Sequence, residues 1–157
     1  MGIRDCLEHA LQTAKELGFS VVNLDNQMGW CEYGEGEEMI AVLGHLDVVP
    51  EGEGWSFPPF GGEIRDGKVL GRGSIDDKGP TITALYALAA LRVSKLPLKR
   101  RIRILFGTNE ETGSITSAMA ENSRLWVLLR TANTRLSMEK KVSLMWILKR
   151  NIPRVVR

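Results

Sequence analysis

Apolar residues recur along the first part of the chain at spacings typical of one amphipathic helix and several short strands. A helical period covers residues 3–17, and Gly18 then stands where a helix commonly ends. The apolar positions of this helix are Ile3, Leu7, Ala10, Leu11, Ala14 and Leu17. Short strands are predicted at residues 19–24 and 30–33, and the continuous apolar run at 39–43 predicts a strand buried on both faces.

The middle of the chain alternates loop, helix and strand. Residues 52–73 are rich in Gly and Pro, which predicts a long loop with a hairpin around Asp66-Gly67. Pro80 favours the start of a second helix, which Leu96-Pro97 would end. A further strand is predicted at residues 102–106. Strands that alternate with helices in this way are typical of an α/β fold.

The composition is that of one ordinary globular domain. The chain has 157 residues, of which 43% are apolar and 25% charged, and this excludes disordered and collagen-like proteins. The longest apolar stretch, residues 82–91, is too short to cross a bilayer, and the first residues lack the apolar core of a signal peptide. Cys6 and Cys31 fit a reducing compartment. We therefore expect a cytoplasmic protein with no membrane partner.

Charge and glycine content both change near Ser114. Residues 115–157 carry nine Arg or Lys against two Glu, a net charge of +7, which leaves −5 for residues 1–114 out of the overall +2. All 16 glycines lie at or before Gly113. The sequence therefore predicts two parts of different origin, residues 1–114 and a basic tail at 115–157.

Acidic residues and a histidine follow the predicted strands. His45 and Asp47 come directly after residues 39–43, Glu110-Glu111 follow residues 102–106, and Asp76-Asp77 precede the second helix. Ligands collect beyond the carboxyl ends of strands in such sheets, and imidazole and carboxylate groups are zinc ligands when thiolates are absent. Asp47 can fix the imidazole tautomer from behind, and one carboxylate of the Glu pair can bind metal while its neighbour accepts a proton.

Three longer strings resemble the motifs of one enzyme family. They are GHLDVVP at 44–50, GRGSIDDKGP at 71–80 and NEETGS at 109–114, and the intervening GWSFPPF at 54–60 and DGKVL at 66–70 also fit. Residues 2–114 thus resemble the dinuclear zinc peptidases that include aminoacylases, carnosinases and desuccinylases, and above all the bacterial PepV-type (Xaa-His) dipeptidases. The resemblance implies part of a zinc-exopeptidase-like catalytic domain, with a mixed central sheet flanked by helices.

The resemblance also implies a role for each acidic position. His45 and Glu111 would each bind one of two zinc ions, and Asp76 would bridge them. Asp47 would orient His45, and Glu110 would be the general base, whereas Asp77 receives no ligand role. The expected reaction is hydrolysis of a dipeptide amide bond by a water that bridges the two metals.

The basic tail contains a second family-like string in another reading frame. Codons allowed for residues 126–142, shifted by two bases, can encode GFTPDGEYPVINGEKG, which resembles the family's next motif with its further acidic ligand. We therefore expect residues 115–157 to derive from a frameshift near Ser114, to lie outside the native sheet and to leave the chain inactive. The alternative is a basic tail specific to a lineage, with a nucleic-acid partner.

Four functions remain open at this point. A dipeptidase is favoured, and an N-acyl-amino-acid deacylase would use the same centre on a related amide. A non-catalytic remnant would keep the sheet without a working metal site. A nucleotide-binding domain is disfavoured, because the glycines lack phosphate-loop spacing and Asp76-Asp77 would repel phosphate. The expected partner is a small peptide or N-acyl-amino acid and not a nucleic acid, and the sequence does not give the oligomeric state.

Overall fold

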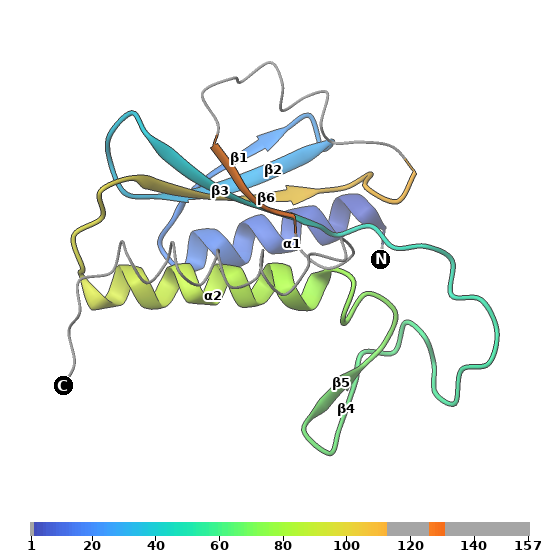
Figure 1. Cartoon of the computed structure of the whole chain (residues 1–157). Coiled ribbons are helices and arrows are strands. Elements are labelled where there is room, and N and C mark those ends of the chain that lie inside the picture. Colours follow the sequence, from blue (N-terminus) through green and yellow to red (C-terminus); the bar gives the residue numbers. More distant parts are fainter. Residues whose placement is uncertain (1, 113–125, 131–157) are drawn as a thin grey trace.

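A mixed five-stranded sheet forms the centre of the molecule, as a computed structural model describes it for residues 2–112 and 126–130 (Figure 1). The strands lie in the order β1-β2-β6-β3-β7. Their bounds are β1 Ser20–Leu24, β2 Met28–Tyr33, β3 Met39–His45, β6 Arg101–Gly107 and β7 Trp126–Arg130. β1, β2 and β6 pair antiparallel, whereas β3 pairs parallel with both β6 and β7. This arrangement confirms the predicted α/β class with a mixed sheet.

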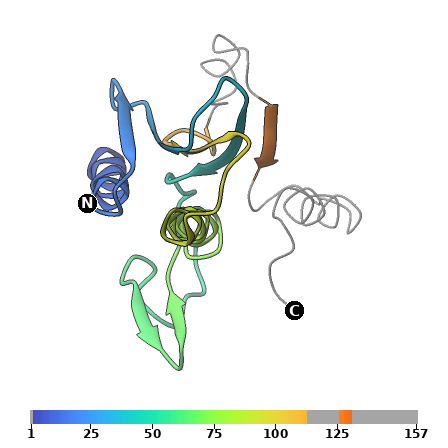
Figure 2. The same cartoon turned by 90° about the vertical axis from the view of Figure 1, so that its left-hand side faces the viewer.

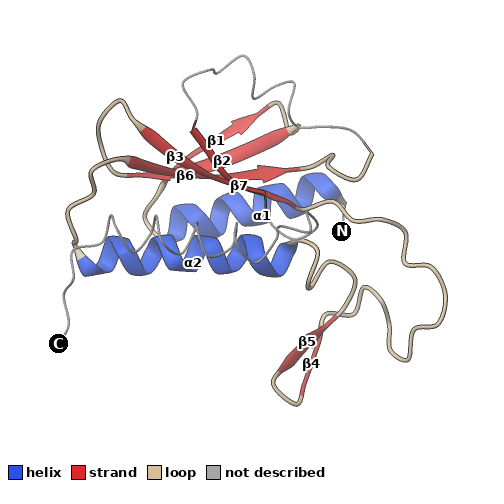
Figure 3. Ribbon diagram, viewed as in Figure 1, coloured by secondary structure: helices blue, strands red, loops and turns tan. Residues whose placement is uncertain are grey.

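Two helices cover one face of this sheet (Figures 1 and 3). α1 (Ile3–Glu16) packs on β1 and β2, and α2 (Lys78–Ser94) packs on β3 and β6. α1 ends where predicted, because Gly18 has φ +82° and allows the chain to turn back. α2 begins at Lys78, two residues before the predicted start, since Pro80 is tolerated within the first turn of a helix.

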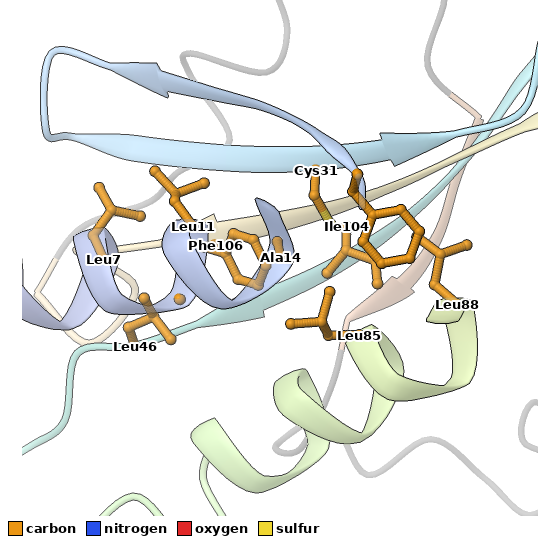
Figure 4. Close-up of a cluster of buried hydrophobic side chains, with 11 residues drawn as sticks. Leu7, Leu11, Ala14, Cys31, Leu46, Leu85, Leu88, Ile104 and Phe106 are labelled. Carbon is orange, nitrogen blue, oxygen red and sulfur yellow. The ribbon is translucent and has the colours of Figure 1, made fainter. Parts of the chain in front are cut away.

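The main core lies between the helices and the sheet. Leu7, Leu11 and Ala14 of α1 meet Leu85 and Leu88 of α2 beneath the inward side chains of the strands (Figure 4). The strand residues in this cluster include Cys31, Ile104 and Phe106. Burial raises the pKa of the Cys31 thiol to about 12, so the side chain stays neutral and packs as a small hydrophobe. The core therefore holds the ends of β3, β6 and α2 in fixed relation to one another.

The predicted hairpin is also present. β4 (Glu63–Arg65) and β5 (Lys68–Leu70) pair antiparallel around Asp66-Gly67, and both residues of the turn have positive φ. The hairpin projects away from the sheet, beyond the α2 side of the molecule (Figures 1 and 2). The loops on either side of it carry the chain from β3 to α2.

Five residues of the tail pair with the sheet. We expected all of 115–157 to lie outside the sheet, but residues 126–130 form β7 beside β3. The physical reason is that Trp126–Leu129 are four consecutive apolar residues, which suit a strand whatever their origin, and β3 offers a free edge for them. The second apolar run of the tail, residues 144–148, lies outside the described residues.

Candidate metal centre

His45 is the last residue of β3 and is almost completely buried, with 5% of its surface exposed. The parallel ladder with β6 fixes its backbone, because His45 pairs with Gly107 and the next amide, of Leu46, donates to the Gly107 carbonyl at 2.8 Å. The ring Nδ1 lies 3.1 Å from the backbone carbonyl of Asp47. A carbonyl only accepts, so Nδ1 carries the proton and Nε2 is the nitrogen presented to a ligand.

The environment of His45 favours its charged form. Burial alone would lower the pKa of the imidazole, but the hydrogen bond to the Asp47 carbonyl and the charges of Asp77 and Asp47, with a hydrogen bond to Asp76, outweigh it. The net pKa of His45 is raised above its ordinary value of 6.5. The surrounding carboxylates thus create a negative potential at this buried nitrogen, which favours any cation.

Asp76 and Glu111 lie close to the His45 ring. Asp76 lies just ahead of α2, and its Oδ1 is 3.1 Å from His45 Nε2. Glu111 lies in the turn after β6. His45, Asp76 and Glu111 each offer a ligand atom, and these atoms all lie within 4.8 Å of one another. The structure therefore brings together all three residues predicted to bind metal.

The donor set fits a zinc ion. One imidazole nitrogen and two carboxylate oxygens are ligands that zinc accepts, and the imidazole is held from behind by its other nitrogen, as ligating histidines commonly are. His45 is buried, whereas Asp76 and Glu111 are half-buried, so the group is partly open to solvent. The residues present can therefore hold a divalent cation.

Asp47 supports this group in a different way from the one predicted. We expected its carboxylate to accept the imidazole proton, but Oδ1 lies 3.5 Å from Nδ1, and the closer contact is made by the Asp47 carbonyl. The other carboxylate oxygen, Oδ2, accepts the backbone N–H of Glu111 at 2.9 Å. Asp47 thereby joins the backbones that carry His45 and Glu111.

Glu110 precedes Glu111 in the same turn and is half-buried. It is not one of the three residues whose ligand atoms meet. This placement is compatible with the predicted division between a ligand and a proton acceptor. The role of general base remains a prediction.

Asp77 is the residue that sequence reasoning missed. Its side chain is fully buried, and Oδ2 accepts hydrogen bonds from the backbone N–H of His45 at 3.2 Å and from the Thr81 hydroxyl at 3.0 Å. The one signal in the sequence is the spacing of Asp77 and Thr81, four residues apart at the start of a helix.

Comparison with known proteins agrees with this geometry. The family model described as "Peptidase family M20/M25/M40" matches residues 41–143. The chain belongs to this family. Its members are metal-dependent peptidases, so the family predicted from the three motifs is confirmed. The matched range includes His45, Asp47, Asp76 and Glu110-Glu111, and it continues beyond Ser114.

Several M20 relatives are described as dipeptidases. YtjP of Bacillus subtilis (strain 168), which carries a provisional dipeptidase name, is 47% identical over 111 residues, covering 71% of this chain and 24% of the relative. The Beta-Ala-Xaa dipeptidase of Lactobacillus delbrueckii subsp. lactis is 43% identical over 109 residues, covering 69% and 23%. This chain thus spans about a quarter of the length of the curated relatives it matches.

A solved structure shares the fold of this M20 chain. The crystal structure of human carnosine dipeptidase 1 superposes with a TM-score of 0.65 at 27% identity, covering 76% of this chain and 29% of that one. Among the residues that the structure describes, no helix is long and apolar enough to cross a membrane.

Proposed function

We propose that this chain carries three ligands of the zinc centre of a cytoplasmic dipeptidase. The observation that carries the proposal is the convergence of His45, Asp76 and Glu111 within 4.8 Å at the ends of β3 and β6. Membership of the M20 family supports the reaction class, and the names of the relatives support a dipeptide substrate.

Each residue of the group has a role in this proposal. His45, Asp76 and Glu111 would hold the zinc, with Asp76 as the carboxylate that two ions would have in common. When bound, zinc polarises a carbonyl and lowers the pKa of a water molecule. Glu110 accepts a proton from the attacking water at its carboxylate and returns it to the leaving amine as the C–N bond breaks. One water is consumed and two amino acids are released.

The chain alone is inactive in this account. If two zinc ions share His45, Asp76 and Glu111, each ion receives two protein ligands, whereas catalytic zinc sites usually have three. The proposed third ligand is the acidic residue encoded by the alternate frame of residues 126–142. A product read in that frame after Ser114 would regain this ligand.

β-Alanyl dipeptides are the first substrates to test, because a relative 43% identical to this chain is a Beta-Ala-Xaa dipeptidase. The assay compares the 157-residue chain, the restored-frame product and its Glu110→Gln variant, each with two equivalents of zinc. N-acyl-amino acids are tested in parallel. We expect the restored product to cleave dipeptides, the Gln variant to be slower by about 10²–10⁴-fold, and the chain to show no turnover.

The other outcomes are equally informative. Cleavage of N-acyl-amino acids in place of dipeptides would assign a deacylase. A restored product that binds two zinc ions and cleaves neither class of substrate would refute the enzymatic function and leave a non-catalytic remnant.

A further inference from the structure

The second residue of the Asp76-Asp77 pair has its own place in the fold. Asp77 is the residue immediately before α2, and its side chain is fully buried. Its Oδ2 receives two hydrogen bonds, one from the His45 backbone N–H at 3.2 Å and one from the Thr81 hydroxyl at 3.0 Å. Burying a carboxylate is costly unless it is hydrogen-bonded, so these two donors help to keep Asp77 in this position.

Thr81 reaches this position because the strand leaves room for it. Thr81 is fully buried in the first turn of α2, facing the end of β3. A Cβ atom added at Gly44 would lie 2.0 Å from the Thr81 hydroxyl oxygen. Glycine at 44 therefore permits close contact between α2 and β3 directly before His45.

We propose that Asp77 and Thr81 are positioning residues that lock the metal-binding histidine onto α2. Asp76 contacts the His45 ring at Nε2, while the adjacent Asp77 holds the backbone of the same histidine. The acidic pair thereby contacts both the ring and the backbone of His45, and the hydrogen bond from Thr81 ties Asp77 to the helix. This proposal deepens the proposed zinc function and rests on it for the part that concerns metal affinity.

The hydrogen bonds from Thr81 to Asp77 and from the His45 backbone to Asp77 are called the clamp below. The clamp explains why two carboxylates are adjacent just before α2. A ligand role for Asp77 as well would need its carboxylate directed at the metal, but its Oδ2 accepts from the His45 backbone N–H and from the Thr81 hydroxyl. Groups that orient metal ligands without touching the ion commonly change metal affinity by 10–100-fold when they are removed. Loss of the Thr81 hydroxyl should therefore weaken zinc binding without removing a ligand.

The test compares three variants of the 157-residue chain. Thr81→Val removes the hydroxyl at nearly constant volume, Thr81→Ser keeps it, and Thr83→Val is the matched control. Thr83 is exposed on the same helix, and its hydroxyl donates to the Gly79 carbonyl at 2.8 Å. Zinc affinity is measured by competition with a chromophoric chelator, and amide exchange of His45 is measured by NMR in the metal-free chain.

We expect Thr81→Val to bind zinc about tenfold or more weakly than the unsubstituted chain, and Thr81→Ser and Thr83→Val to remain within about threefold of it. In the metal-free chain, His45 amide exchange should accelerate in Thr81→Val, while exchange of Val42 in the middle of β3 should not. If Thr81→Val does not fold, Thr81→Ala takes its place, and its zinc affinity and His45 exchange are compared with those of Thr81→Ser, which keeps the hydroxyl.

Two results would overturn the clamp. One is unchanged zinc affinity and unchanged His45 exchange in Thr81→Val. The other is an equal loss in Thr83→Val. If the unsubstituted chain binds no zinc, the proposed function fails, whereas the exchange comparison still decides whether the clamp exists.

Discussion

Gly44→Ala is expected to destabilise the fold strongly, because the new methyl group enters occupied space. It would lie 2.0 Å from the Thr81 hydroxyl oxygen and 2.9 Å from the Thr81 Cβ, where contacts under 3.0 Å force something to move. Thr81 must then shift by about 1 Å in a turn that leads into the buried Leu85, or rotate away from Asp77.

The cost can be worked from these two responses. Overpacking a core typically costs about 1–3 kcal/mol, and leaving the buried Asp77 carboxylate short of one donor costs about 1–3 kcal/mol. Either response therefore predicts a loss of about 1–3 kcal/mol in the free energy of unfolding. This is a large share of the roughly 5–15 kcal/mol that a domain of ordinary stability possesses.

Urea denaturation in the presence of a chelator measures this loss without a contribution from bound zinc. Because both substitutions disturb one contact, the double variant Gly44→Ala/Thr81→Ala should lose less stability than the sum of the single variants, by about 0.5–3 kcal/mol. A Gly44→Ala change of less than about 0.5 kcal/mol, or strict additivity in the double variant, would refute the close contact between α2 and β3.

Two further predictions concern charged groups. Burial raises the pKa of Glu32, but the hydrogen bonds and charges of Arg103 and Arg101 outweigh burial and lower the pKa below its ordinary value of 4.5. Glu32 therefore stabilises the fold above pH 4.5, and this stabilisation is lost as the pH falls through the lowered pKa. Glu32→Gln should therefore have a lower free energy of unfolding than the unsubstituted chain at pH 7. In urea titrations, this difference in free energy should shrink below about pH 4. A difference that does not change with pH would contradict this. Glu111→Ala should weaken zinc binding by at least about tenfold, whereas Glu110→Ala should leave it within about threefold in chelator competition. Equal losses would make Glu110 a ligand as well.

The elements of the fold were largely predictable from local pattern. The apolar run at 39–43 lies in β3, which ends at His45, and the run at 102–106 lies in β6, which ends at Gly107. The candidate ligands lie at or just after these two strand ends. Strand order was not predictable, because β6 lies between β2 and β3 and pairing over such distances leaves no local signal. The pairing of 126–130 with β3 was missed for the same reason.

The candidate site was predictable in its ligands but not in their support. His45, Asp76 and Glu111 belong to long motifs, so they could be chosen without the structure. The function of Asp77 depends on burial against the His45 backbone, and that of Asp47 on a turn 64 residues later in the chain. Sequence motifs identify the residue types needed for chemistry, whereas hydrogen bonds to the backbone appear only when distant segments meet.

A metal centre in this chain is tested by measuring how tightly the 157-residue chain binds zinc. The measurement is competition with a chromophoric chelator for the unsubstituted chain, for His45→Ala, and for His9→Ala as the matched control, since His9 is an exposed histidine of α1. We expect the chain to bind zinc, His45→Ala to weaken this binding by at least about tenfold, and His9→Ala to leave it unchanged. No zinc binding by the unsubstituted chain, or an equal affinity for His45→Ala, would contradict a metal centre at the ends of β3 and β6.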